Sequence, residues 1–302
     1  MIDVVIQALS LVAIIGLGQL MRRLKWVDAR HFMIFSRIVL NFTLPCAILT
    51  SFHTVTVPFA MLTLGLVAVG LNLCQQVSAY LLCRRQGRTT QAFGVLNTGS
   101  YNMGAFATPY LAGFGGPTAL INATLFDIGN SIVAAGWGRF WAFSIARPGR
   151  TSMGASLKRL FSSTIFVLYL AVLVMQLLRL RLPDQVMHFT STVGAANTFL
   201  AMLMIGIGLD LDLDTSQLRA AGRFLAVRYA WCIAFALGCW HLLPFGDDVR
   251  LAVTTICFAP IASMIPGFTA EIGGDVKLSA FMTSLTILVS IVVMPVLVMV
   301  LR

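Results

Sequence analysis

The chain has 302 residues, of which 58% are hydrophobic and only 11% are charged, and its formal net charge is +10. Roughly a quarter of the residues in a soluble domain are charged, so this chain has too little polar surface for a globule that faces water. The mean hydropathy of +0.89 indicates an integral membrane protein and excludes disordered, collagen-like and disulfide-scaffold chains.

Ten apolar runs are long enough for helices across the hydrocarbon core, which requires about 20 residues each. The predicted spans are 4–21, 32–52, 58–82, 91–113, 117–142, 160–179, 187–209, 222–243, 249–271 and 277–301. The runs are continuous and lack the alternation of barrel strands, so we expect an all-α polytopic membrane protein. The first run lacks the basic start and cleavage site of a signal peptide, and we expect it to be retained.

The basic residues are distributed unevenly between the two sides. The connections after odd-numbered spans contain fifteen, namely Arg22, Arg23, Lys25, Arg30, Arg84, Arg85, Arg88, Arg139, Arg147, Arg150, Lys158, Arg159, Arg219, Arg223 and Lys277. The opposite side contains four, namely Arg179, Arg181, Arg250 and Arg302. The positive-inside rule then predicts that both termini face outside, and nucleic acid is not needed as a partner. Arg37 and Arg228 lie near predicted helix ends, where we expect them to snorkel.

Cysteines and histidines indicate no metal centre. The six cysteines lie in apolar runs without C-x-x-C spacing, and the four histidines are scattered. Buried thiols behave as small hydrophobic groups. We therefore expect no metal site, no cofactor and no catalytic residues.

A short internal repeat relates the two halves of the chain. Residues 107–116 read A-T-P-Y-L-A-G-F-G-G, and residues 264–274 read M-I-P-G-F-T-A-E-I-G-G. The prolines are 157 positions apart and the glycine pairs 158. Five spans separate the copies, and an odd number reverses their orientation in the membrane. We therefore predict two inverted five-helix repeats, 1–150 and 151–302, as in secondary transporters.

The fourth and ninth predicted spans contain residues that interrupt helices. Prolines and glycines release backbone groups at membrane depth, and these groups must find partners or line a wet cavity. The expected substrate-binding residues are Asn97, Asn102, Gly104, Pro109, Pro260, Ser263 and Pro266. Exposed helix N-termini suit an anion there, and freed carbonyls suit a cation. The alternative is a pair of proline-kinked helices that pack closely and bind nothing.

Ionisable and amide side chains inside the spans are the candidates for ion coupling. Asp127 is predicted near mid-depth in the fifth span, with Asn130 one turn further on. Gln75 in the third span and Asn41 in the second are candidates for polar support. Purely structural hydrogen bonds are the alternative for all four. The sequence leaves the coupling ion open between a proton and sodium.

The motifs in these spans resemble the auxin efflux carrier family, bacterial relatives of the plant PIN carriers. The family's N-x-G-x-x-G-x-P pattern and following glycine correspond to Asn102, Gly104, Ala107, Pro109 and Gly115, with alanine where glycine is usual. Its P-x-A segment, glycine–acidic turn and Thr/Ser-rich helix ending in proline correspond to Pro260, Ala262, Gly274, Asp275 and the stretch 283–295. Asp127 and Asn130 match a D-x-x-N of the fifth helix.

The resemblance implies a scaffold of helices 1, 2, 6 and 7 and a mobile transport domain of helices 3–5 and 8–10. Helices 4 and 9 would be broken and would cross. The family belongs to a wider superfamily with bile acid, arsenite and riboflavin transporters. Its substrates are organic anions such as auxin-like carboxylates, malate and malonate. The plant carriers' long cytoplasmic loop is missing here.

We therefore expect an elevator-type secondary carrier of a small organic anion in the inner membrane. Whether it forms a homodimer is left open. The alternative is a sodium-coupled symporter of the bile-acid carrier type. A channel is a weaker alternative because broken helices also line pores. An intramembrane protease is weaker still, because the Gly206-Ile207-Gly208-Leu209-Asp210 segment departs from a G-x-G-D loop in its spacing. No enzyme is expected.

Overall fold

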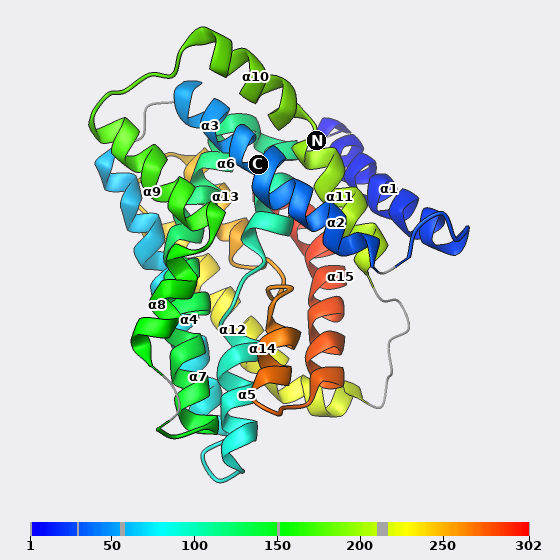
Figure 1. Cartoon of the computed structure of the whole chain (residues 1–302), viewed down its shortest axis with the longest axis vertical. Coiled ribbons are helices and arrows are strands. Elements are labelled where there is room, and N and C mark those ends of the chain that lie inside the picture. Colours follow the sequence, from blue (N-terminus) through cyan, green and yellow to red (C-terminus); the bar gives the residue numbers. More distant parts are fainter. Residues whose placement is uncertain (1, 29, 55–57, 150–151, 210–216, 302) are drawn as a thin grey trace.

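Figure 1 shows the protein as a computed structural model that describes residues 2–28, 30–54, 58–149, 152–209 and 217–301. Arg150 and Arg302 of the topology prediction, and Asp210 of the protease alternative, lie outside the described residues. Every regular element in the described ranges is a helix. The α-helices are α1 (Ile2–Arg23), α2 (His31–Ile38), α3 (Leu44–Thr54), α4 (Thr63–Leu82), α5 (Arg88–Thr98), α6 (Thr108–Ser131), α7 (Gly138–Ala146), α8 (Met153–Phe161), α9 (Thr164–Leu177), α10 (Asp184–Ala195), α11 (Asn197–Gly208), α12 (Leu218–Leu242), α13 (Asp247–Ile256), α14 (Ile265–Glu271) and α15 (Val276–Leu301).

Four short elements join some of these helices. The π-helical turns η1 (Val39–Thr43), η3 (Met103–Ala107) and η4 (Ile132–Trp137) precede α3, α6 and α7, and the 3₁₀ turn η2 (Phe59–Leu62) precedes α4. A π turn inserts one residue into a helix and is common at functional sites. η3 lies in the fourth predicted span, which the sequence had marked as irregular.

Six helical runs of the described chain are long and apolar enough to cross a membrane, or seven if the α8–α9 pair, bent by 70°, forms one span. These runs make the protein an all-α, multi-pass membrane protein. One run covers Arg88–Ala146 over 59 residues, where the sequence predicts two spans. Gly116 divides that run, since its φ of 59° and ψ of −147° are not helical and Pro117 follows it. The count of ten spans and the outside termini stay predictions.

Small residues allow two pairs of helices to approach closely. α1 packs along α11, where Gly18 and Gly206 face each other and a Cβ on either would meet the partner's backbone. α4 packs along α6 in the same way, because a Cβ on Gly129 would meet the carbonyl of Gly65. Such contacts replace the hydrophobic driving force that is missing between helices in lipid.

The elements gather around two hydrophobic clusters. α1, α3 and α11 lie in the upper half of Figure 1, and α5, α7 and α14 in the lower half. The smaller cluster joins α5, α7, α12, α14 and the start of α15. The larger cluster contains α3, α6, α9, α11 and α13. The division into a scaffold and a transport domain stays a prediction.

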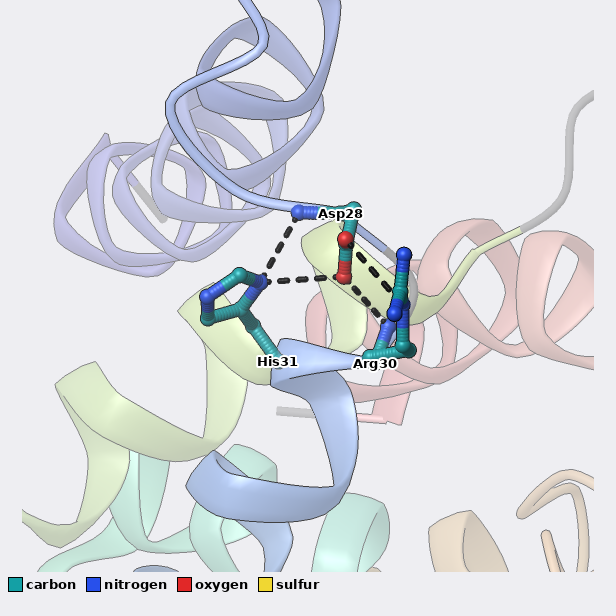
Figure 2. Close-up of polar contacts among 3 residues, drawn as sticks. All are labelled: Asp28, Arg30 and His31. Carbon is teal, nitrogen blue, oxygen red and sulfur yellow. Dashed lines mark hydrogen bonds and ion pairs between the residues drawn. The ribbon is translucent and has the colours of Figure 1, made fainter.

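The turn between α1 and α2 is ordered by Asp28 (Figure 2). Its carboxylate accepts a hydrogen bond of 2.8 Å from the Arg30 backbone N–H and lies 3.0 Å from Nδ1 of His31. The Arg30 guanidinium is 3.4 Å from its other oxygen. The backbone hydrogen bond from Arg30 is the main reason that the pKa of Asp28 is lowered below its usual 3.8.

Candidate functional site

Two helices are interrupted within the protein, and the breaks face each other. The first break follows the end of α5 at Thr98 and reaches Asn102, the residue before η3. The second lies between Ile256 at the end of α13 and Ile265 at the start of α14. At the first break, Gly99 is closely packed, because a Cβ there would meet Gln76 and the carbonyl of Asn72. At the second break, Pro260 has no N–H with which to continue α13.

The first break lies earlier than the prolines suggest. Pro109, a predicted substrate-binding residue, lies after the break, in the first turn of α6 and beyond the π turn of η3. Pro266 likewise occupies the first turn of α14. Proline is well tolerated in the first turn of a helix because the N–H there has no partner within the helix. Both prolines therefore start the second half-helices.

Asn102 joins the two breaks. Its backbone N–H donates to the carbonyl of Pro260 at 2.8 Å, and its side-chain Nδ2 donates to Oγ of Ser263 at 2.7 Å. Asn102 is buried, at 6% exposure, whereas Ser263 is exposed. The structure thus brings Asn102, Pro260 and Ser263, all three predicted, together where the two breaks meet. We call this meeting point of residues 98–102 and 257–264 the crossing.

Arg228 of α12 lies at the centre of the same crossing. It is fully buried, at 0% exposure. Its Nη1 donates to the carbonyls of Thr98 at 2.6 Å and Ser100 at 2.9 Å, and its Nη2 donates to the carbonyl of Ala259 at 2.8 Å. The guanidinium also lies over the ring of Tyr101, 4.3 Å from the ring centre. The expectation that this arginine snorkels from a helix end is wrong.

Further backbone groups of the first break have partners as well. Gln76 Nε2 donates to the carbonyl of Gly99 at 2.9 Å. The side chain of Asn130 pairs with both backbone groups of Tyr101. Asn130 Oδ1 accepts from the Tyr101 N–H at 3.1 Å, and Asn130 Nδ2 donates to the Tyr101 carbonyl at 3.0 Å. The carbonyl of Asn102 accepts from the N–H of Ala107 at 3.0 Å, which closes the π turn.

α15 supplies the partners of the second break. The hydroxyl of Thr286 accepts from the Ile261 N–H at 3.1 Å, and the hydroxyl of Ser290 donates to the carbonyl of Phe258 at 2.7 Å. Unpaired backbone groups in a buried site are costly, so these side chains are what allows the helix to stop.

Asp127 is buried, at 5% exposure, and is connected to the first break. Its Oδ1 accepts from Asn130 Nδ2 at 2.8 Å, and its Oδ2 accepts from the hydroxyl of Tyr169 in α9 at 2.7 Å. A chain of hydrogen bonds therefore runs from Tyr169 through Asp127 and Asn130 to the backbone of Tyr101.

Two further predicted residues, Gln75 and Asn97, form hydrogen bonds at or near the crossing. Gln75 is part of it, since its Nε2 donates to the hydroxyl of Tyr101 at 2.7 Å and to the carbonyl of Arg228 at 3.1 Å. Asn97 holds α5 against the second half of the chain, donating to Thr269 at 3.1 Å and accepting from Ser279 at 2.6 Å.

Two predicted residues face other parts of the protein. Gly104 packs against the side chains of Leu40 and Leu44, each 3.3 Å from the position of a Cβ. Asn41 is exposed and bonds to the Arg37 carbonyl and the Thr164 hydroxyl. The structure does not bring Asn41 into the crossing.

Sequence reasoning missed several residues at the two breaks, among them Arg228, Tyr101 and Tyr169. Arginine inside a predicted span is a signal, because an ionisable side chain at membrane depth is a candidate for function. Arg228 lies six residues inside the predicted span 222–243, so this signal was present. The two tyrosines carry no comparable signal, because a tyrosine in an apolar helix is ordinary.

The helices define a multi-pass membrane protein, and broken helices that meet at a polar contact are a feature of secondary transporters. In agreement, residues 197–302 match the model of the Sodium Bile acid symporter family. No curated protein matches the chain. The match covers about a third of the chain, including α11 to α15 and thus the second break. It supports the wider bile acid and arsenite transporter superfamily and does not single out the auxin efflux carriers.

Proposed function

We propose that the protein is a secondary active transporter of an organic anion, built on the plan of the bile acid symporters. The family match supports this type better than an auxin-type carboxylate carrier. Two broken helices that meet at a polar crossing are the arrangement that transporters use to hold substrates and ions. We further propose that the protein resides in the inner membrane.

The positive charge of Arg228 at the crossing is the observation that supports an anionic substrate. Among the described residues, no carboxylate lies within ion-pair distance of Arg228, so the guanidinium is a buried positive charge without a charged partner. A buried cation that contacts only neutral groups in a low-dielectric site favours a ligand of opposite sign. Asn102 and Ser263 provide hydrogen-bonding groups beside it, at the exposed edge.

The transport step in this proposal is an elevator. α4 to α7 and α12 to α15 would move with the anion against a scaffold of α1 to α3 and α9 to α11. The hydrogen bond between Asp127 in α6 and Tyr169 in α9 then crosses the moving boundary and must break in each cycle. A channel would leave this bond unchanged.

Uptake into proteoliposomes tests the proposal. Purified protein is supplied with a labelled bile acid, malate, malonate or an auxin-like carboxylate, with sodium or choline outside and at two pH values. We expect saturable uptake of at least one anion and a loss of at least roughly tenfold in Ser263→Ala, which corresponds to one hydrogen bond to a charged group.

Ser162→Ala serves as the control, because Ser162 is an exposed serine at the end of α8 that bonds to the carbonyl of Lys158. Its uptake should equal that of the unchanged protein. Absence of uptake for every anion, or equal uptake by the Ser263 and Ser162 variants, would contradict the proposal.

A further inference from the structure

We propose that Arg228 is a built-in cation that takes the place of a bound sodium ion at the crossing, so that the protein carries its anion without sodium. The inference rests on the proposed function for its transport consequence. The name of the matched family implies sodium, and the residues of the crossing can be tested for their fit to that ion.

The backbone carbonyls of the broken ends do not suit a sodium ion. Transporters with broken helices coordinate cations through unwound carbonyls and the C-terminal ends of half-helices. Here the corresponding carbonyls, of Thr98, Ser100 and Ala259, accept hydrogen bonds of 2.6 to 2.9 Å from Arg228. The remaining carbonyls from Gly99 to Asn102 and at Phe258 and Pro260 also have donors. Each of these oxygens already uses one lone pair on a donor, and a metal ion at the carbonyls of Thr98, Ser100 and Ala259 would lie directly beside the positive charge of Arg228.

The electrostatics of the two breaks explain why a cation is needed. α5 and α13 both end at the crossing, and each C-terminus carries partial negative charge. One guanidinium contacts carbonyls from both ends, and this joins the two halves of the chain through α12. A sodium ion could neutralise the same two helix ends, but it would have to bind and leave. Arg228 is covalently attached and stays charged under all ordinary conditions.

The position of Arg228 excludes a role limited to packing at a lipid interface. It lies near the middle of α12, it is fully buried, and its charge faces the ring of Tyr101. Its Nε has no hydrogen-bond partner among the described residues, so one donor remains for a ligand. An anion bound beside it would make the loaded crossing neutral, and a neutral pair is cheaper to move through the low-dielectric interior than a lone charge.

A thermal-stability experiment separates the built-in cation from a bound one. The melting temperature of the full-length protein in detergent is measured in sodium chloride, choline chloride or low millimolar methylguanidinium, at constant ionic strength. The unchanged protein should melt at the same temperature in all three. Arg228→Ala should lose roughly 5–10 °C in choline, because three buried carbonyls lose their donor, and should regain part of the loss in sodium or methylguanidinium.

Arg223→Ala is the matched control, since Arg223 is on the same helix but is exposed, with its guanidinium carbon 4.6 Å from the centre of the Phe224 ring. It should melt like the unchanged protein and respond to none of the cations. If Arg228→Ala does not fold, Arg228→Lys and Arg228→Gln replace it. The lysine variant should be the more stable of the two, and only the glutamine variant should be stabilised by sodium.

Two results would overturn the inference. One is a rise in the melting temperature of the unchanged protein in sodium relative to choline, and the other is an Arg228→Gln or Arg228→Ala protein with unchanged stability. Transport gives an independent reading, because the unchanged protein should take up its anion equally in sodium and choline. If no anion is transported while the melting results hold, the proposed function fails and the assignment of Arg228 stands.

Discussion

Asn130 provides the sharpest test of how the first break is held. Its side chain makes three buried hydrogen bonds, two to the backbone of Tyr101 and one to Asp127. Asn130→Leu keeps the approximate shape of the side chain and removes all three. Buried hydrogen bonds between membrane helices contribute about 0.6 to 1.7 kcal/mol each, so the variant should lose roughly 2–5 kcal/mol.

Asn122 is the matched control on the same helix. It is also buried, at 0% exposure, but neither polar atom of its side chain has a hydrogen-bond partner among the described residues. Asn122→Leu should therefore be neutral or stabilising, since it removes an unsatisfied polar group.

Reversible unfolding in mixed detergent micelles gives the free energies of both variants. Equal losses in Asn130→Leu and Asn122→Leu would refute the reasoning, because packing and not the hydrogen bonds to Tyr101 would then account for the loss. A neutral Asn130→Leu would refute it as well. Uptake should fall with stability at residue 130 and remain normal at residue 122.

Two further predictions concern packing and pH. Gly129→Ala should cost about 1–3 kcal/mol, because the added Cβ meets the backbone of Gly65, whereas Gly238→Ala, with nothing within 4 Å, should be neutral or stabilising in the same unfolding assay. The lowered pKa of Asp28 means that its contribution to stability is present above pH 3.8 and is lost as the pH falls through the lower folded value. Asp28→Asn should therefore melt with a weaker dependence on pH below 3.8, and an unchanged pH profile would contradict this assignment.

The sequence predicts interruptions in the fourth and ninth spans because the relevant signals are local. Asn102, Pro260 and Ser263 were predicted as site residues from prolines, glycines and amides in otherwise apolar spans, and the structure brings all three together. These residue types interrupt helices wherever they occur, so the composition of a single span is enough to suggest a break. The exact position of the break was harder, because a π turn shifts the hydrogen-bond register by one residue before Pro109.

Arg228 shows where local signals end. A charged residue some turns inside a span can reach an interface by snorkelling or face the interior, and its distance from the helix end does not distinguish these. The interior choice depends on acceptors, and those acceptors are carbonyls of Thr98, Ser100 and Ala259, which lie 31 to 130 positions away. A similar distance of 42 positions separates Tyr169 from Asp127.

By itself, the sequence determined that this is a helical, multi-pass membrane protein with irregular segments near residues 97–109 and 259–267, because hydrophobicity and helix-breaking residues act over a few turns. Only the tertiary structure decided which side chains satisfy the backbone groups that those irregular segments release. Such pairing depends on which helices become neighbours, and it placed the side chain of Arg228 among the carbonyls that the sequence marked as free to hold a cation.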